Sequence, residues 1–178
     1  HLAVRRHGGI FDVSHMGRFS ISGPDALGFL RHALTNDAAL LEPGWSQYTL
    51  IADANGFAVD DAYLCRWHQD EYLLVVNAGN LEKDWQHLVA LSTPFDVQLS
   101  NLSVETAMLA IQGPESARLL SDLFGVAIPG PRRNKLGFAT WGGADIKISR
   151  TGYTGEAVGF ELICPAELAV PIWDSVLD

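Results

Sequence analysis

The same sequence pattern occurs twice in this chain of 178 residues, with Gly23 and Gly113 at equivalent positions. The segments ISGPDALGFLRHAL (21–34) and IQGPESARLLSDLF (111–124) each lead through Gly-Pro and an acid into a helical apolar pattern. Such a Gly-Pro is typical of a break between a strand and a helix, with proline near the first turn and the acid at the positive end of the helix dipole. The repeat therefore indicates an internally duplicated fold.

A second pair of segments supports the duplication. EYLLVVNAGNLEKDWQHL (71–88) and GFELICPAELAVPIWDSVL (159–177) both read as strand, short turn and helix. Short strands without regular alternation with helices favour an α+β fold, built from duplicated β-α-β-β-α type units with antiparallel sheets, over a doubly wound fold. The predicted strands, which accompany about four helices, are 19–21, 48–52, 58–66, 72–76, 107–111, 144–149 and 160–164.

The duplication also predicts how the chain divides into domains. A boundary near residue 103 gives a first subdomain over 1–103 and a second, incomplete one over 104–178, with 95–104 and 126–136 as connections. The chain begins with His1 rather than Met and ends inside a helix-like pattern. We therefore expect it to be a fragment of a longer protein.

Charge and cysteine content exclude several classes of function. With 12 Lys and Arg against 21 Asp and Glu, the net charge of −9 argues against nucleic acid or an anionic membrane as partner, and favours a small molecule or a protein. Cys65 and Cys164 lie in apolar runs, which indicates a reducing, cytoplasm-like compartment. The six histidines show no metal-ligand spacing, so no metal is assigned.

The stretch GFAVDDAYL (56–64) reads as a buried strand but carries two adjacent carboxylates, Asp60 and Asp61. Successive side chains of a strand point to opposite faces, so the two should not form one acid–base site unless a bulge intervenes. Alternation places Asp61 on the more aromatic face, together with Phe57, Val59, Tyr63, Cys65 and Trp67. The turn Asn55-Gly56 predicts a hairpin with strand 48–52, which would bring Tyr48 towards Asp61.

Residue types alone leave several roles open. Asp61 either accepts hydrogen bonds from a neighbouring loop or faces a ligand. Glu161 raises the same question, because a buried carboxylate can bind the adjacent N–H donors of a heterocycle. Asn77, at the end of a strand, either satisfies local backbone groups or reaches into a cleft. Ser14 and His15 are sequence neighbours that lack a G-x-S-x-G elbow, so a structural turn is preferred to a hydrolase triad.

Seven motifs, taken in order, resemble the aminomethyltransferase (T-protein) family of the glycine cleavage system. They are GGIFDVSHMG, SGPDALGFL, LTNDAALLEPGWSQYTL, GFAVDDAYL, EYLLVVNAGNLEKDW, AIQGP and RTGYTGEAVGFE. The resemblance covers nearly all of the chain, and several motifs in order are more specific than any one alone. It implies an enzyme that moves an aminomethyl carbon from the lipoyl arm of the H-protein to tetrahydrofolate. Ammonia is released and 5,10-methylenetetrahydrofolate is formed.

The resemblance also implies roles for individual residues. Asp61 matches the second Asp of the family's DD pair, which lies beside the folate nitrogens that accept the carbon. Orientation of the pterin and charge stabilisation are its preferred roles, and proton transfer is the alternative. Glu161 matches the residue that would pair with the amino-pyrimidine edge, although TGEAVGFE has one residue more than the usual family pattern. Positions lining the folate pocket are matched by Met16, Tyr48, Val75, Asn77 and Tyr153.

Three alternatives remain from the sequence. Dimethylglycine and sarcosine dehydrogenases carry the same module behind a flavin domain, but FDVSHMG favours the free-standing enzyme. Non-catalytic folate-binding relatives carry a KGCYxGQE run, whose Cys is missing from RTGYTGE. A ligand-free α+β domain would keep Asp61 and Glu161 apart, each satisfied by protein partners. In the T-protein reading, the family's first segment and C-terminal domain lie outside this chain. The protein would then be cytoplasmic, or mitochondrial in a eukaryote.

Overall fold

The computed structural model describes residues 1–125 and 132–177 of the chain. These residues form two compact units, one comprising His15–Ser103 and the other comprising His1–Ser14 with Val104–Asp178. Each unit has its own antiparallel sheet and its own apolar core. We describe each unit by itself.

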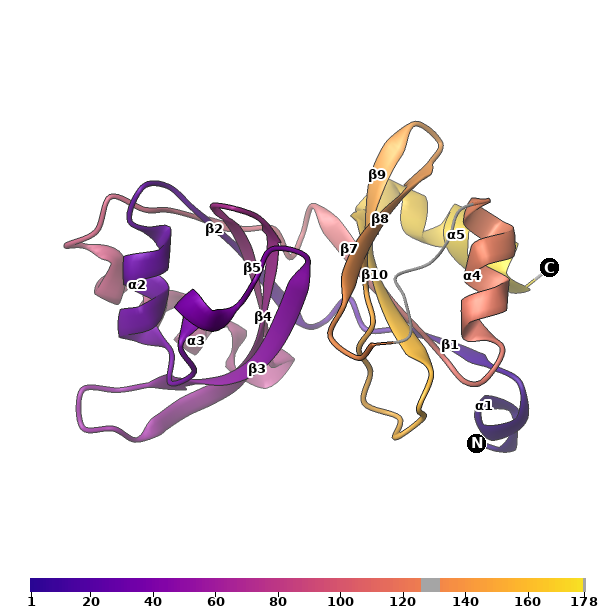
Figure 1. Ribbon diagram of the computed structural model, residues 1–178, viewed down its shortest axis with the longest axis horizontal. Coiled ribbons are helices and arrows are strands. Elements are labelled where there is room, and N and C mark those ends of the chain that lie inside the picture. Colours follow the sequence, from indigo (N-terminus) through magenta and orange to yellow (C-terminus); the bar gives the residue numbers. More distant parts are fainter. Residues whose placement is uncertain (126–131, 178) are drawn as a thin grey trace. The chain divides into compact units, whose positions relative to one another are not determined.

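The unit of residues 15–103 is a five-stranded antiparallel sheet with two helices on one face (Figure 1). The strand order is β3-β4-β5-β2-β6. In chain order its elements are β2 (Gly17–Ser22), α2 (Ala26–Ala33), the short helix Ala38–Leu40, β3 (Trp45–Ala52), β4 (Ala58–His68), β5 (Glu71–Val76), the short helix Ala78–Asn80, α3 (Leu81–Ser92) and β6 (Gln98–Asn101).

The core of this unit lies between the sheet and the two helices. Alternate residues of the strands, such as Phe19 and Ile21 of β2 and Leu64 of β4, meet Phe29 and Leu30 of α2 and are fully buried. Burial of side chains of this size, worth about 1.5–3 kcal/mol each, fixes which face of each strand points inward.

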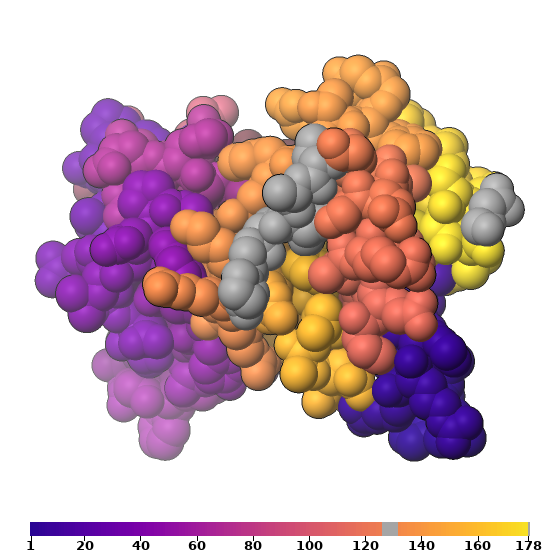
Figure 2. Space-filling model, turned by 45° about the vertical axis from the view of Figure 1, so that its right-hand side comes forward, coloured from indigo at the N-terminus to yellow at the C-terminus, as the bar shows by residue number. Residues whose placement is uncertain are grey.

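The other unit repeats this architecture. Its sheet has the order β1-β7-β10-β9-β8, and α4 and α5 lie on one of its faces, where they form part of the surface of this unit (Figures 1 and 2). Its elements are α1 (Leu2–Arg6), β1 (Gly9–Asp12), β7 (Thr106–Gln112), α4 (Ser116–Phe124), β8 (Leu136–Trp141), β9 (Ala144–Ser149), β10 (Gly159–Pro165), the short helix Ala166–Leu168 and α5 (Ala169–Leu177).

The α+β class, the antiparallel sheets and the duplication predicted from the sequence are confirmed. The series β2-α2-β3-β4-β5-α3 corresponds to β7-α4-β8-β9-β10-α5, so each repeat has three strands between its helices, one more than in the predicted β-α-β-β-α type unit. The fifth strand differs in origin. β6, which lies beside β2, follows α3 in the chain, whereas β1, which lies beside β7, comes from the N-terminal segment.

Residues 1–14 correct the expectation that 1–103 forms one subdomain. Residues 9–12 pair with residues 112–109 of β7, so the N-terminal segment belongs to the unit that contains Val104 and the residues after it. Local pattern cannot reveal such a pairing, because it joins strands about 100 residues apart in the sequence.

The repeated glycines are required by geometry. Gly23 and Gly113 have φ values of +117° and +127°, a region that L side chains rarely adopt. A Cβ on Gly23 would lie 2.9 Å from the Asp96 carbonyl oxygen, and one on Gly113 would lie 2.6 Å from the Val4 carbonyl oxygen. In each repeat the glycine therefore lets the turn between strand and helix pass close to another backbone segment.

One predicted connection contains a strand, and the other ends where a strand begins. Segment 95–104 includes β6, and segment 126–136 ends at the first residue of β8. Residues 126–131 of the second connection lie outside the described residues. β6 has only four residues and β8 begins with Leu-Gly, so neither carries the alternating apolar pattern that marks a strand in sequence.

Candidate active site

The hairpin that carries the two adjacent carboxylates forms as predicted. β3 pairs with β4 in antiparallel register, with Tyr48 opposite Tyr63 and Leu50 opposite Asp61. The Asp53 carboxylate closes the turn by accepting hydrogen bonds from the backbone N–H groups of Asn55 (2.8 Å) and Phe57 (2.9 Å). The bond from the Phe57 N–H contributes most to lowering the pKa of Asp53.

Asp60 and Asp61 lie at the point where β4 extends beyond β5. The last pair between these strands joins Ala62 to Val76, and Asn77 follows directly. Asn77 Nδ2 donates to Asp61 Oδ1 at 2.8 Å and to Asp60 Oδ1 at 3.1 Å. The Asn77 side-chain amide thus lies where β5 would otherwise continue to pair with β4. It donates to both carboxylates, although the alternation of side chains along β4 directs them to opposite faces of the sheet.

The shared amide links the two carboxylates, which were expected not to form one acid–base site unless a bulge intervened. The register also shifts between Ile51 and Ala52, which inserts an irregularity next to Asp60 in β4. Val59, which simple alternation places with Asp61, packs instead against the apolar core of the unit. Side chains of β4 therefore alternate between the two faces of the sheet from Asp60 to Trp67, but not between Asp60 and the turn at Asn55-Gly56.

Tyr48 completes the site on the Asp61 side of the sheet. Its ring meets that of Tyr63 edge-on, with centroids 6.4 Å apart, and its hydroxyl is hydrogen-bonded to Asp61. Burial, followed by the charge of Asp61 and this hydrogen bond, raises the pKa of Tyr48. The ring remains 48% exposed, so Tyr48 and Asp61 present a hydroxyl and a carboxylate at an accessible position.

The remaining predicted residues of this unit lie close by in the sheet. Val75 of β5 pairs with Tyr63 and therefore shares the face of Asp61. Met16 directly precedes β2, and its carbonyl oxygen accepts a hydrogen bond of 2.7 Å from the buried guanidinium of Arg18. The structure thus places Met16, Tyr48, Val75 and Asn77 in the same unit as Asp61.

Sequence reasoning missed Asp84, a fully buried carboxyl group of α3 on the opposite side of β4. Burial, with a hydrogen bond to Asp60 and the charge of Asp60, raises the pKa of Asp84 to about 7. Burial alone would also raise the pKa of Asp60, but hydrogen bonds from Asn77, Asp84 and Asn80 outweigh it and lower that pKa. One signal was available, because Leu81, Asp84 and Leu88 share the apolar face of the helix.

Glu161 lies in the other unit, on the strand that corresponds to β5 and not to β4. It lies on β10 between Ala110 of β7 and Ser149 of β9, and is 7% exposed. Thr151 Oγ1 donates to its carboxylate and lies 3.0 Å from Ser149 Oγ. Burial raises the pKa of Glu161, and the Thr151 hydrogen bond acts in the opposite direction.

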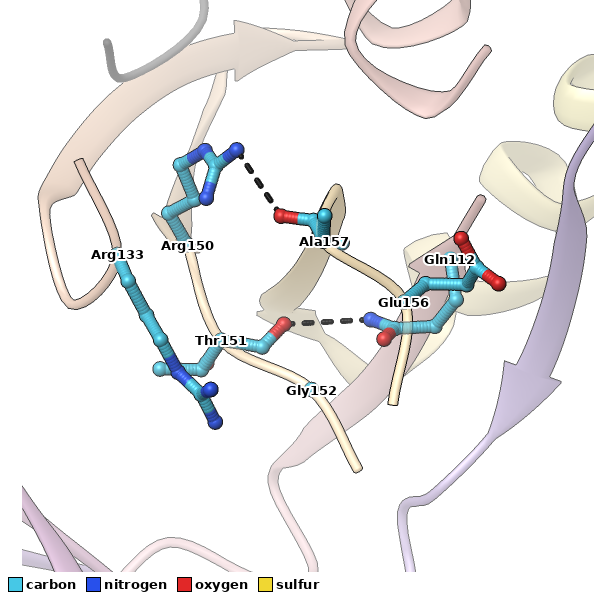
Figure 3. A pocket seen from close by; sticks show the side chains of 8 residues that line it. Gln112, Arg133, Arg150, Thr151, Gly152, Glu156 and Ala157 are labelled. Carbon is cyan, nitrogen blue, oxygen red and sulfur yellow. Dashed lines mark hydrogen bonds between the residues drawn. The ribbon is translucent and has the colours of Figure 1, made fainter. Parts of the chain in front are cut away.

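The glycine-rich segment after β9 is arranged around a buried glutamine (Figure 3). Gln112 Nε2 donates to the carbonyl oxygens of Thr151 and Phe160, both at 3.2 Å. A Cβ on Gly152 or Gly159 would collide with this amide. The segment and Gln112 line a cavity of about 180 Å³ with Arg133 and Arg150, while Tyr153 is 71% exposed.

Ser14 takes a structural role. Its hydroxyl accepts a hydrogen bond from the Met108 backbone N–H at 3.0 Å and lies 3.4 Å from the Met108 carbonyl oxygen. These bonds continue the pairing of β1 with β7. They support the structural interpretation of the Ser-His pair over a catalytic one.

The chain is thus an α+β protein with two antiparallel sheets built from one repeated unit, and a carboxylate, an amide and a phenol gather at one sheet end. The family model described as the GCVT N-terminal domain matches residues 1–178, and the chain belongs to this family. The match confirms the family inferred from the seven sequence motifs.

Individual relatives agree with this assignment. The chain is 46% identical over 178 residues to an aminomethyltransferase of Thermus thermophilus and 44% identical over 177 residues to one of Deinococcus deserti. These matches cover 100% and 99% of this chain, and 51% and 49% of the relatives. The chain therefore spans about half the length of the curated relatives it matches.

Solved structures show the same fold. The glycine cleavage system aminomethyltransferase T of Bartonella henselae matches with a TM-score of 0.88 and 36% identity over 99% of this chain and 47% of that chain. A heterotetrameric sarcosine oxidase of Corynebacterium matches with a TM-score of 0.71 at 16% identity over 99% of this chain and 87% of that chain, which shows the fold alone. Within the described residues, no helix is long and apolar enough to cross a membrane.

Proposed function

We propose that the protein carrying this chain is an aminomethyltransferase of the glycine cleavage system. It transfers the one-carbon unit from the aminomethylated lipoyl arm of the H-protein to tetrahydrofolate, and releases ammonia. The observation that carries the proposal is the Asp61 carboxylate, held by Asn77 and Tyr48 at the end of β4, in a chain 46% identical to a named aminomethyltransferase.

Each unit by itself carries residues whose chemistry suits a part of tetrahydrofolate, the proposed carbon acceptor. Asp61 uses Oδ1 to accept from Asn77, and the Tyr48 ring beside it is half exposed, so a ligand nitrogen could approach the carboxylate. Glu161 accepts from Thr151 through Oε2, which leaves Oε1 to accept from an amino-pyrimidine edge. Met16, Val75 and Tyr153 would supply apolar and aromatic contact.

The geometry favours electrostatic and orienting roles for Asp61. Two fixed partners, Asn77 and Tyr48, hold its side chain, so little reorganisation is needed when positive charge develops on the transferred carbon. The same carboxylate would orient the accepting nitrogen. Proton transfer from that nitrogen is the alternative role, and the hydrogen-bonded Tyr48 hydroxyl offers a neighbouring group for it.

The cellular setting follows from the same proposal. A lipoylated H-protein is the expected protein partner, and a reducing compartment, cytoplasmic or mitochondrial, is the expected location. Cys65 and Cys164 are both buried free thiols, which is compatible with a reducing compartment.

The test is to measure 5,10-methylenetetrahydrofolate formation by the full-length protein, with aminomethylated H-protein and tetrahydrofolate as substrates. Reactions that lack either substrate, or that contain H-protein without its lipoyl group, are the controls. Product and ammonia in equal amounts, only in the complete reaction, would support the proposal. Tetrahydrofolate binding without any transfer would instead favour a non-catalytic folate-binding protein.

A further inference from the structure

A buried carboxyl group without an ordinary partner lies behind the candidate site. Leu81, Asp84 and Leu88 share one face of α3, so the helix directs Asp84 towards the sheet with its apolar neighbours. Asp84 is 0% exposed. A charge taken out of water in this way costs several kcal/mol unless it is paired or neutralised.

The hydrogen-bond donors near Asp84 bind other acceptors. Among the described residues, no N–H or hydroxyl donor reaches either oxygen of Asp84 or Oδ2 of Asp60, and all three atoms are buried. Lys83, the adjacent cation, donates to the Val59 carbonyl oxygen at 2.8 Å. His87, one turn further along α3, lies 3.1 Å from the Ala52 carbonyl oxygen through Nε2.

The other charged groups facing Asp84 are few. Asp60 and Asp61 act on it from β4, and Lys83 acts from its own helix. α2, which packs against α3, carries Arg31, paired with Asp37, and the exposed His32. Because Asp60 and Asp84 lie within hydrogen-bond reach of each other, a proton on one of them is the donor that satisfies both.

The surroundings decide which carboxyl group holds this proton. Asp60 accepts hydrogen bonds from the side chains of Asn77 and Asn80, which favour its ionised form. Asp84 has no such donor and is more deeply buried, so its neutral form is favoured. The proton therefore belongs on Asp84.

We propose that Asp84 is a neutral carboxylic acid that donates to Asp60 and thereby positions Asp61 through Asn77. The chain of contacts is continuous: Asp84 to Asp60, Asp60 to Asn77 Nδ2, and Asn77 Nδ2 to Asp61. Since the two N–H bonds of one amide point in fixed directions, anchoring one on Asp60 aims the other at Asp61. Asp84 acts through its neighbours, so it is a positioning residue.

Loss of the proton would disturb this arrangement. Two adjacent carboxylates in a buried position repel each other, and Asp60 would move away from Asp84 or exchange its partners. Asn77 would then lose one of the acceptors that fix its orientation. The positioning role rests on the proposed function of Asp61, whereas the shared proton does not.

Two variants of the full-length protein separate the possibilities. Asp84→Asn keeps the shape and an N–H donor for Asp60 but cannot titrate, and Asp84→Leu removes the donor. Glu82→Gln, which neutralises an exposed acid on the same helix turn, is the matched control. The first measurement is an infrared titration of aspartate carboxyl groups, in which the band lost in Asp84→Asn reports Asp84.

We expect that band to show a protonated acid at pH 6, which ionises near neutral pH. A band of an ionised carboxylate at pH 6 would contradict the proposal that Asp84 shares its proton with Asp60. For the transfer reaction, we expect Asp84→Leu to lose on the order of 10²-fold in kcat with little change in the KM for tetrahydrofolate. Asp84→Asn should recover most of this loss, and the wild-type decline in kcat above about pH 7 should be absent from it.

Equal kcat values and pH profiles in wild type, Asp84→Asn and Asp84→Leu would overturn the positioning role. A wild-type protein without transfer activity would overturn the proposed function and the positioning role together. The infrared titration would still decide the shared proton in that case, so the two failures can be told apart.

Discussion

Burial and the supply of donors, more than residue type, distinguish the three carboxyl groups around β4. Asp61 is held at an accessible sheet end, Asp60 takes donors from two asparagines, and Asp84 is enclosed without an N–H donor among the described residues. The pKa of Asp60 is therefore lowered and that of Asp84 is raised, because their surroundings differ. This gives each of them a separate role at neutral pH.

The raised pKa of Asp84 predicts a pH dependence of stability. Its ordinary pKa of 3.8 applies to the unfolded chain, and the folded value is about 7, so the native state holds more protons between these values. The stabilising contribution is complete below about pH 4 and is lost as the pH rises through about 7. Urea unfolding midpoints across this range should fall more steeply for wild type than for Asp84→Asn.

The difference between wild type and variant isolates Asp84 from Glu161, whose pKa is also raised and whose contribution has the same sign. Asp60, with a lowered pKa, contributes a slope of opposite sign only at more acidic pH. Parallel curves for wild type and Asp84→Asn between pH 4 and 7 would contradict the prediction.

Sequence reasoning reached the accessible residues of the site but not the buried one. Asp61, Tyr48 and Asn77 belong to motifs that are recognisable by order and spacing. Asp84 follows Glu82 in the first turn of a helix, where acids are common because of the helix dipole, and only its helical spacing from Leu81 and Leu88 distinguishes it from Glu82. The packing of α3 shows that Asp84 faces inward.

At the level of elements, the Gly-Pro turn is the feature that each repeat depends on. As predicted, proline lies near the first helical turn, because α2 begins at Ala26, two residues after Pro24. Asp25 is the N-cap residue, at the positive end of the helix dipole, and it has a second role. Its carboxylate accepts from the Asp96 backbone N–H at 2.9 Å, so it joins the turn to the segment before β6.

A pair of glycine substitutions tests this feature. Gly113→Ala should destabilise its unit by about 1–3 kcal/mol, because the residue has positive φ and its Cβ would meet backbone atoms. Gly28→Ala, at an exposed position inside α2 where a Cβ would make only ordinary van der Waals contact with the Phe95 ring, should stabilise its unit by about 1 kcal/mol. Both can be measured as shifts in urea unfolding midpoints. A neutral Gly113→Ala would contradict the turn geometry.

The sequence predicted those strands that have one or two strongly apolar faces, such as β5, β7 and β10. β1, β6 and β8 were not predicted, because β1 and β6 have four residues each and β8 alternates weakly. All three lie at sheet edges. An edge strand has one hydrogen-bonded neighbour and needs less apolar surface, so its sequence carries a weaker signal.

At the level of the whole molecule, the chain contains two copies of one structural repeat. The fifth strand of each sheet comes from a different part of the chain. The sequence showed the copies through their Gly-Pro turns and through the similar segments 71–88 and 159–177. It could not show that residues 1–14 pair with β7, since that contact joins distant segments.

This division predicts how pieces of the chain behave. The segment 15–103 contains a complete five-strand sheet, both of its helices and a continuous core, so we expect it to fold alone. The segment 104–178 lacks β1 and should be unfolded or aggregated unless residues 1–14 are attached. Amide spectra of the two segments provide the measurement. A disordered 15–103 segment would contradict the independence of the unit.

The central claim is that Asp61 serves the transfer reaction and not merely the fold. Its most direct test compares Asp61→Asn with Asp70→Asn, an exposed acid in the turn after β4, in the full-length protein. Calorimetry gives tetrahydrofolate affinity, and the complete assay with aminomethylated H-protein gives turnover. We predict that Asp61→Asn retains folate binding while turnover falls by about 10²- to 10³-fold, with Asp70→Asn unchanged in both. Full turnover in Asp61→Asn would contradict the account.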